Sequence, residues 1–407
     1  MAEQDGLGGP VVGMVGAGQL ARMTSQAATA LGVTFRVLAD SPADSAAQVC
    51  AGTTVGDYHS PADLLAFAKG CDAVTFDHEH VPGDHLAELA VAGVPVHPGP
   101  AALRYAQDKL AMRTRLSGLD VPCPRFAPVS SLADVTNFPG RWPSTVVLKA
   151  TRGGYDGKGV WVCRTQAEAE EVLSHGLPLI AEEFVPFEAE LAALVARSPF
   201  GQGAAYPLVQ TVQRDGICRE VIAPAPGLDP EIAVAAQSLA LRVAEELGVT
   251  GLLAVELFLV GGKLLVNELA MRPHNCGHWT IEGSRTSQFE QHLRAVLDLP
   301  LGSTELAAPQ VVMANVLGGS DGDMLGRLHH VLAADPALKV HLYGKRVRPG
   351  RKIGHVTALG TDVAELRDRA MSAAGYLRWG EDGEGGEDGE GGGTAADGGD
   401  NPEGSAA

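Results

Sequence analysis

The alternation of short apolar stretches with longer amphipathic stretches over residues 10–100 is the feature that most constrains the fold. Each apolar stretch has the length of a buried strand, and each amphipathic stretch has the length of a helix. The first pair is "VVGMVG" followed by "QLARMTSQAATALG", a helix that we expect to end at Gly32. The last stretch, "VPVHP", predicts a strand, and the segment from His97 to Pro124 then predicts a linker and one helix. Repeats of this kind predict a parallel sheet covered by helices, and therefore an α/β domain.

A glycine-rich turn joins the first predicted strand to the first predicted helix. Gly16, Gly18 and Ala21 fit the G-x-G-x-x-G/A pattern of a dinucleotide-binding turn. Asp40 follows at about the spacing at which such domains place their ribose ligand. Taken alone, these residues indicate an NAD-dependent dehydrogenase, which is the remote alternative for this chain.

The pattern changes near residue 120, where strands and turns replace the strand–helix repeat. "STVVLKA" and "GVWVC" predict strands on either side of a glycine-rich loop, and "AYPLVQTVQRDGICREVIAP" predicts a hairpin that turns at Asp215-Gly216. "EAELAALVAR" fits a strand or a helix, and a long helix is expected from the cap Asp229 to Gly248. From about residue 305 a smaller region ends in a further helix. The chain as a whole is thus predicted to combine α/β and α+β domains.

The loop "LKATRGGYDGKGV" is a candidate phosphate-binding segment. It lacks the spacing of a Walker A loop. Its glycines would let backbone N–H groups approach phosphate oxygens closely, and Lys149 and Lys158 could offset the charge of a triphosphate. The alternative is a mobile hairpin tip at the surface.

Two glutamates in otherwise apolar strands form a candidate metal site. Glu256 and Glu268 lie in "LLAVELFLVGGKLLVNELAM", where a lone charge is costly unless it is paired or bound to a metal. A three-residue loop would place them directly opposite each other, with a magnesium ion between them. A two-residue turn would pair Glu256 with Asn267 and turn Glu268 to the other face, so this hypothesis depends on the register. The alternative is two glutamates that face solvent.

These segments together resemble a known family. Lys149 with "GGYDGKG", "AEEFV", the glutamate pair and "NELAMRPHNCGHWT" resemble ATP-grasp ligases. "VGAGQLARM", "SQFEQHLRAVLDLPLG" and "YGKRVRPGRKIGHV" narrow the resemblance to the 5-(carboxyamino)imidazole ribonucleotide synthase family of purine biosynthesis. The resemblance spans about Val11 to Gly360.

The resemblance implies an ATP-grasp fold with an N-terminal Rossmann-like (pre-ATP-grasp) domain and a small C-terminal domain. The implied ranges are a disordered N-terminus at 1–9, the Rossmann-like domain at 10–105, the ATP-grasp domain at 106–302, a substrate-binding C-terminal domain at 303–378 and a disordered tail at 379–407. The Gly16–Ala21 turn would then face the ribonucleotide substrate or serve only as a packing turn.

The implied reaction is the ATP-dependent carboxylation of 5-aminoimidazole ribonucleotide with bicarbonate, through carboxyphosphate, to give the N-carboxylated ribonucleotide, ADP and phosphate. Magnesium would assist the phosphoryl transfer. The carboxyl donor is either carboxyphosphate itself or carbon dioxide released from it in place. The alternative within the fold is another ATP-grasp ligase that uses formate or a different amine acceptor.

The resemblance also implies roles for individual residues. The catalytic residues would be Arg272, Lys149 and Glu268, and the metal ligands would be Glu256 and Glu268. The ATP site would contain Arg104, Lys149, Gly154, Tyr155, Asp156, Gly157, Lys158, Gly159, Val160, Glu182, Glu183, Phe184, Val185, Glu190, Gln210, Asn267 and Glu268. The side chain of Glu182 would read the adenine edge. The site for the ribonucleotide and bicarbonate would contain Glu79, Tyr155, Asp156, Arg272, His274, Asn275, Lys345, Arg351 and Lys352.

The chain departs from the family pattern at four positions. Met271 stands where the family has a proline, and Cys276 stands where it has a serine, a stronger hydrogen-bond donor. Asp77 and His78 replace a glutamate and an apolar residue. A cysteine contact to the substrate at position 276 is therefore in question.

A basic segment and a pair of histidines allow more than one interpretation. "YGKRVRPGRK" holds five basic residues in ten and fits a phosphate monoester, or is simply a solvated basic strand. His274 and His278 lie four residues apart, but Pro273, Asn275 and Gly277 disfavour a shared helix. We interpret both histidines as loop residues near a substrate and not as a zinc site.

Composition sets the remaining expectations. The net charge is −18, and half of it lies in the tail from Gly380 to Ala407, which carries nine acidic and no basic residues. The mildly acidic remainder argues against nucleic-acid binding, and the apolar runs are too short to span a bilayer. Six scattered cysteines without C-x-x-C spacing suit the cytoplasm. The family resemblance suggests a homodimer.

Deletion of residues 381–407 should leave turnover and the melting temperature almost unchanged. This segment offers no apolar side chain larger than alanine for burial in a core. A fall of several degrees in calorimetry would show instead that the tail docks on the body.

Overall fold

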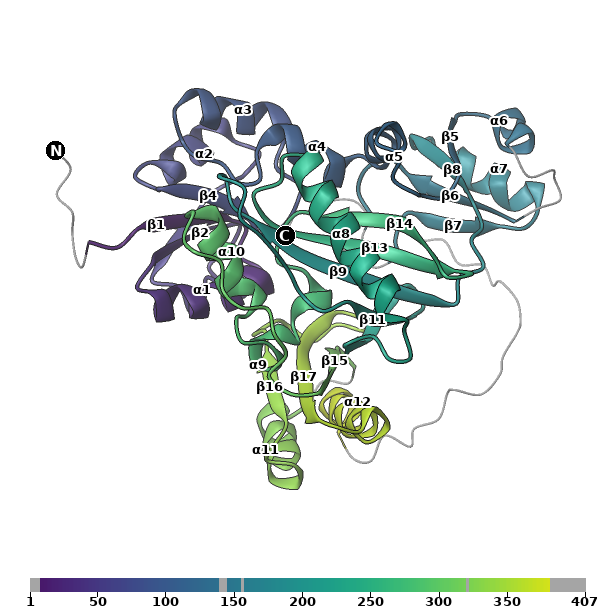
Figure 1. The fold of residues 1–407 in the computed structure, drawn as a ribbon. Coiled ribbons are helices and arrows are strands. Elements are labelled where there is room, and N and C mark those ends of the chain that lie inside the picture. Colours follow the sequence, from purple (N-terminus) through teal and green to yellow (C-terminus); the bar gives the residue numbers. More distant parts are fainter. Residues whose placement is uncertain (1–7, 139–144, 155–156, 320–321, 381–407) are drawn as a thin grey trace.

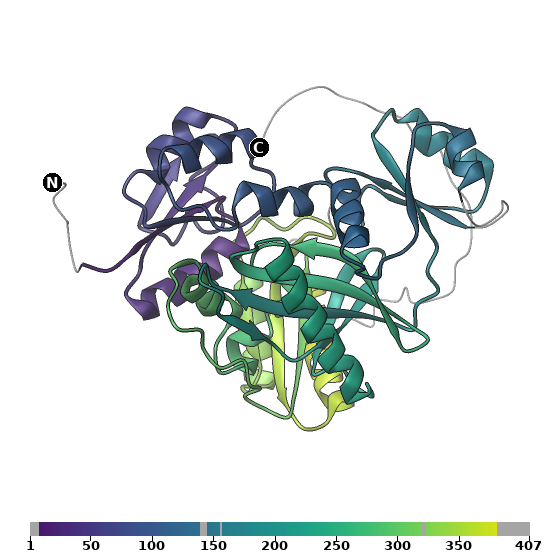
Figure 2. The same ribbon diagram turned by 45° about the horizontal axis from the view of Figure 1, so that its top comes forward.

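The computed structural model describes residues 8–138, 145–154, 157–319 and 322–380 of the chain. Three β-sheets organise the described residues into an N-terminal lobe, a small lobe and a large central sheet (Figure 1). The view in Figure 2 shows the two smaller lobes side by side above the central sheet. Of the two segments expected to be disordered, 1–9 and 379–407, residues 1–7 and 381–407 lie outside the described residues, whereas Trp379 is the last residue of a helix.

The N-terminal lobe is the predicted parallel sheet covered by helices. Its strands are arranged β3-β2-β1-β4, and every pair is parallel. Strand β3 was not predicted, and the predicted strand "VPVHP" is reduced to one bridge between Val96 and Val74. The elements are β1 (Val11–Val15), α1 (Gln19–Leu31), β2 (Thr34–Ala39), β3 (Gly52–Val55), α2 (Pro61–Ala68), β4 (Ala73–Phe76) and α3 (Gly83–Val91).

The glycine turn before α1 is closed by a carboxylate of the protein itself. Gly16 has φ of +97°, and a Cβ there would collide with the Asp77 carboxylate. The N–H of Gly18 donates to Asp77 Oδ2. Burial raises the pKa of Asp77 to about 6, against the effect of this backbone hydrogen bond. The helix N-terminus, which in a dinucleotide-binding domain receives a phosphate, is thus already occupied by Asp77.

Two helices connect the N-terminal lobe to the rest, where one was expected. Asp108 is extended and accepts a hydrogen bond from the N–H of Ala111, so it ends one helix and caps the next. The helices are α4 (Pro100–Gln107) and α5 (Lys109–Gly118). They lie between the two smaller lobes (Figures 1 and 2).

The small lobe is an antiparallel sheet with the order β5-β8-β6-β7, flanked by two helices. Both helices begin with a capping box, at Ser131 and at Thr165. The elements are β5 (Phe126–Val129), α6 (Leu132–Asn137), β6 (Val146–Ala150), β7 (Val160–Cys163), α7 (Gln166–Ser174) and β8 (Leu179–Glu183).

The central sheet contains, among the described residues, nine strands, with the path β14-β13-β9-β11-β12-β15-β17-β16 and β10 beside β9. Its first part comprises β9 (Ala189–Arg197), β10 (Gly203–Ala205), β11 (Val209–Arg214), β12 (Ile217–Ala223), α8 (Pro230–Glu246), β13 (Gly251–Val260) and β14 (Lys263–Ala270). The ambiguous "EAELAALVAR" is strand β9, because it pairs with both β13 and β11 and is buried over most of its length. The hairpin turn at Asp215-Gly216 is confirmed.

The C-terminal region continues the same sheet, since β12 pairs with β15. Helix α12 packs on β15 and β17, whereas helix α11 was not predicted. The remaining elements are η1 (Asn275–Gly277), α9 (Thr280–Gly283), α10 (Gln288–Val296), β15 (Gln310–Leu317), α11 (Met324–Ala334), β16 (Lys339–Leu342), β17 (Lys352–Gly360) and α12 (Val363–Trp379). None of the helices in the described ranges has the length and apolar character needed to cross a membrane.

A buried histidine joins the N-terminal lobe to the central sheet. His292 Nδ1 accepts from the N–H of Leu252 at 3.2 Å, so Nε2 carries the proton that faces Thr75 Oγ1 at 2.7 Å. Burial lowers the pKa of His292 to about 3. The neutral ring therefore belongs to the folded state.

The free energy of unfolding should fall as the pH is lowered from about 6.5 towards 3, because the unfolded chain takes up a proton at His292 that the folded chain excludes. The loss from this group should reach about 3 kcal/mol by pH 4. The free energy of unfolding of His292→Gln, measured by urea titration, should be lower than that of the wild type at pH 7 but should fall less between pH 6.5 and pH 4. The exposed His59→Gln serves as control, and equal losses in the wild type and His292→Gln would contradict the assignment.

Candidate active site

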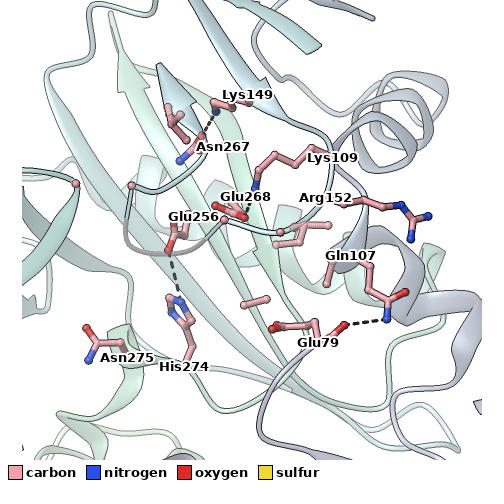
Figure 3. A pocket seen from close by; sticks show the side chains of 18 of the residues that line it. Glu79, Gln107, Lys109, Lys149, Arg152, Glu256, Asn267, Glu268, His274 and Asn275 are labelled. Atoms are coloured by element: carbon pink, nitrogen blue, oxygen red, sulfur yellow. Dashed lines mark hydrogen bonds and ion pairs between the residues drawn. The ribbon is translucent and has the colours of Figure 1, made fainter. Parts of the chain in front are cut away.

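A cavity of about 1280 Å³ lies between the three lobes. Side chains from the N-terminal lobe, from α4 and α5, from the small lobe and from the central sheet line it, and Figure 3 shows how ten of them are arranged. The described residues hold no group of three or more histidine, cysteine or acidic side chains placed to bind a metal.

A β-bulge decides the register of the two predicted metal ligands. Val260 pairs with Lys263, so the hairpin has the two-residue turn that was expected to separate Glu256 from Glu268. The register then shifts beyond Leu257, and Glu256 pairs with Glu268 after all. Asn267 is the extra residue of the bulge. Because a bulge breaks the strict alternation of a strand, Asn267 and Glu268 both line the cavity.

Three buried charges form the base of the nucleotide side of the cavity. Lys149 Nζ lies 2.8 Å from Glu182 Oε2 and 3.0 Å from Asn267 Oδ1. Glu182 Oε1 lies 2.7 Å from Arg113 Nε, and the Arg113 and Glu182 side chains are almost completely buried. Burial lowers the pKa of Lys149, with Glu182 opposing that shift. The Glu182 carboxylate, expected to read the adenine edge, is thus already bound to two cations.

The glutamate pair is only partly balanced by a cation. Lys109 Nζ lies 2.5 Å from Glu268 Oε1 (Figure 3). His274 Nε2 lies 3.6 Å from Glu256 Oε1, but burial lowers the pKa of His274 well below its usual value, so this ring is neutral. Burial, with the nearby Glu268 and Glu190 carboxylates, raises the pKa of Glu256 to about 7. This excess of negative charge suits a cation between the two carboxylates.

The glycine-rich loop packs against the central sheet. Gly154 has φ of +82°, and a Cβ there would collide with the carbonyl oxygen of Lys158. Gly157 lies against Gly216 in the turn between β11 and β12. Tyr155 and Asp156, expected to contact both ATP and substrate, lie outside the described residues.

The end of β8 and the facing strands form an apolar wall. Phe187 and Phe258 stack with ring centroids 4.7 Å apart, and both line the cavity beside Phe184 and Val185. Burial raises the pKa of Glu190 in the same wall to about 7. Such an apolar wall suits the face of a flat heterocycle.

The opposite end of the cavity carries a guanidinium held by a carboxylate. Arg272 Nε lies 2.7 Å from Glu79 Oε2, whereas the buried Glu79 Oε1 has no partner among the described residues. Gln107 fixes this loop by donating to the carbonyl oxygens of Glu79 and Val81 at 2.8 and 2.7 Å. Cys276, which stands where the family has a serine, is buried and belongs to the cavity lining, with its Sγ 3.1 Å from His274 Nδ1.

His278 follows the short helix η1 and belongs to the cavity lining. Its side chain is fully buried, and Nδ1 contacts Gln288 Nε2 at 3.0 Å. Its ring packs against His355 with centroids 5.1 Å apart.

The cavity brings together most of the predicted site residues. Among those described, the lining includes Glu79, Arg104, Lys149, Gly154, Gly157, Val160, Glu182, Glu183, Phe184, Val185, Glu190, Glu256, Asn267, Glu268, Arg272, His274, Asn275 and Lys352. Five predicted residues are not part of the lining: Lys158, Gly159, Gln210, Lys345 and Arg351. Strand β11 instead presents Thr211, the neighbour of Gln210, to the cavity. Lys345 Nζ donates to Gln19 Oε1 at the start of α1.

Sequence reasoning missed Gln107, Lys109 and Arg113. All three lie in "AQDKLAMRTRL", which was interpreted only as a linker and a helix. The sequence signal was the Asp108 cap, after which Lys109 and Arg113 fall on one face of a helix at i and i+4.

The fold and the site define an ATP-grasp enzyme. Three family models match in sequence order: the ribonucleotide synthetase preATP-grasp domain over residues 10–107, the ATP-grasp domain over 114–289 and the phosphoribosylaminoimidazole carboxylase C-terminal domain over 311–369.

Individual relatives narrow the class. The N5-carboxyaminoimidazole ribonucleotide synthase of Mycobacterium bovis is 56% identical over 91% of this chain and 88% of its own length. The crystal structure of the synthetase from Thermus thermophilus is 41% identical, with a TM-score of 0.81 over 91% of this chain and 99% of that one. The enzyme from Aspergillus clavatus, solved with ADP and 5-aminoimidazole ribonucleotide, is 32% identical, with a TM-score of 0.82 over 91% and 98%. The chain belongs to the N5-carboxyaminoimidazole ribonucleotide synthase family, and the dehydrogenase suggested by the glycine turn is wrong.

Glu268→Gln should lower ATP turnover by roughly a hundredfold or more at saturating magnesium while leaving the melting temperature nearly unchanged. The substitution keeps the shape of the side chain but removes one charge of the pair. Glu246→Gln, at a surface ion pair with Arg115, is the matched control and should keep full turnover. Near-normal turnover of Glu268→Gln would contradict a role for this carboxylate in the chemistry.

Proposed function

We propose that the chain catalyses the ATP-dependent carboxylation of 5-aminoimidazole ribonucleotide with bicarbonate, giving N5-carboxyaminoimidazole ribonucleotide, ADP and phosphate in purine biosynthesis. The observation that carries this proposal is that one cavity is lined by Lys149, which can bind a triphosphate, by the Glu256/Glu268 carboxylate pair and by the Arg272–Glu79 ion pair. The family relation supports the same reaction.

The nucleotide is assigned to the side of the cavity next to the small lobe. The adenine would lie against the wall formed by Phe184, Val185 and the stacked Phe187–Phe258 pair, with its edge on backbone groups of β8, since the Glu182 carboxylate is bound to Arg113 and Lys149. Lys149 and Arg104 would offset phosphate charge. The glycine-rich loop would cover the phosphates and exclude water, which matters because carboxyphosphate hydrolyses readily.

Magnesium is assigned to Glu256, Glu268 and the Asn267 amide oxygen. These hard oxygen donors lie side by side because of the bulge, and the raised pKa of Glu256 reflects a need for positive charge there. Magnesium bound by one or two carboxylates together with substrate phosphates is its usual arrangement in such enzymes. The ion would neutralise charge on the transferred phosphoryl group.

Bicarbonate and the ribonucleotide are assigned to the other end of the cavity. Arg272 would orient bicarbonate for attack on the terminal phosphorus of ATP. The unpartnered Glu79 Oε1 is placed to accept a hydrogen bond from a donor group of the ribonucleotide. The exocyclic amine would then attack the carboxyl carbon, either of carboxyphosphate or of carbon dioxide released from it in place.

A homodimer and a cytoplasmic location complete the proposal. The homodimer follows from the family resemblance, and the cytoplasmic location follows from the six cysteines, which form no disulfide. Light scattering of the purified chain tests the first, and fractionation of the cells that make it tests the second.

The decisive experiment is phosphate release from ATP, measured with and without aminoimidazole ribonucleotide and bicarbonate. Turnover that requires both supports the proposal. Turnover with formate in place of bicarbonate, or with another amine, would identify a different ligase of the same fold.

Lys352→Ala should raise the Michaelis constant for the ribonucleotide about ten- to a hundredfold, because one charge-assisted hydrogen bond is lost. The Michaelis constant for ATP should change little. Lys352 lines the cavity, whereas Arg351 is exposed beside it. Arg351→Ala is the matched comparison, and we expect a change of the same kind but smaller. Equal effects on both substrates would indicate that the basic segment supports the fold instead.

A further inference from the structure

Helix α5 holds the β-bulge that places Asn267 and Glu268 in the cavity. At a bulge the ladder is interrupted, so backbone groups need other partners. Arg113 supplies them: its two terminal nitrogens donate to the carbonyl oxygens of Val266 and Asn267 at 2.9 and 2.7 Å. One turn earlier, Lys109 reaches the Glu268 carboxylate from the same helix face.

The same guanidinium also fixes the other side of the nucleotide site. Arg113 Nε donates to Glu182 Oε1 at 2.7 Å, and the second oxygen of Glu182 binds Lys149. Two of its three partner residues, Glu182 and Asn267, line the cavity, although Arg113 itself does not. Its side chain is fully buried, so no solvent can replace any of these bonds.

We propose that Arg113 is a positioning residue for the phosphoryl-transfer half of the reaction. It fixes the bulged strand β14 and, through Glu182, the ammonium group of Lys149 as one unit. The planar fork of arginine is required because three acceptors in different directions must be bound at once, which the single ammonium of lysine cannot reproduce. The proposal rests on the proposed function and adds to it a residue that touches neither substrate nor metal.

The test separates positioning from stability. Arg113→Met should lower turnover about ten- to a hundredfold, the loss expected from misplaced catalytic groups. The magnesium concentration for half-maximal turnover should rise, while the Michaelis constant for the ribonucleotide should stay within twofold. Arg113→Lys should restore only part of the turnover.

Because Arg113→Met leaves the Glu182 charge buried with one partner fewer, this variant is also expected to lose stability. The double variant Arg113→Met/Glu182→Gln removes that charge and should recover much of the melting temperature. Its turnover should remain at or below that of Arg113→Met, and its affinity for ADP, measured by calorimetry without turnover, should remain weak. Recovery of both turnover and ADP affinity would overturn the proposal, since Arg113 would then only neutralise Glu182.

Arg367→Met is the matched structural control. Arg367 binds the buried Glu220 carboxylate through two hydrogen bonds, at 2.7 and 3.1 Å, away from the cavity. This control should lower the melting temperature with no change in magnesium dependence. If Arg113→Met likewise lowers the melting temperature without changing the magnesium dependence, the role of Arg113 is structural only. Absence of ribonucleotide-dependent turnover in the wild type, measured in the same assay, would instead refute the proposed function.

Discussion

The pairing of buried charges governs how this active site is built. Lys149, Glu182 and Arg113 lie where water is largely excluded, and each would be costly to bury alone. Together they link the small lobe, helix α5 and the bulged strand of the central sheet. These three parts of the protein are therefore tied to one another by a single group of buried charges.

The Asp77 carboxylate explains why the Gly16–Ala21 turn, which resembles a dinucleotide-binding turn, does not define the function. The glycines before α1 create a helix N-terminus ready for an anion, and Asp77 fills that position from the neighbouring strand. The nearby Lys345, bonded to Gln19, draws the basic C-terminal segment to the same place. The turn lies at the edge of the cavity, and Gly18 and Gln19 belong to its lining.

Many residues of the cavity lining could be predicted because they occur in short sequence motifs. The loop after Lys149, the hairpin with Glu256 and Glu268, and the Arg272 segment each carry residue types with few other uses in that pattern. Gln107, Lys109 and Arg113 escaped notice because their partners lie far away in the sequence. The positions of Gln210 and His278 were set by strand alternation and by burial, neither of which a motif reveals.

The sequence by itself determined the three-part ATP-grasp organisation, the strand–helix alternation of the first hundred residues, and the family of the enzyme. The alternation depends on short-range periodicity, whereas the organisation and the family were identified from the resemblance of several motifs to known enzymes. Tertiary structure alone decided that β15 to β17 extend the central sheet and that Glu256 faces Glu268. The sequence left the turn length open, and the observed two-residue turn would by itself separate the two glutamates; the bulge at Asn267, bonded to Arg113 of a distant helix, restores the pair. Such a bond joins residues more than 150 positions apart, so no local pattern encodes it.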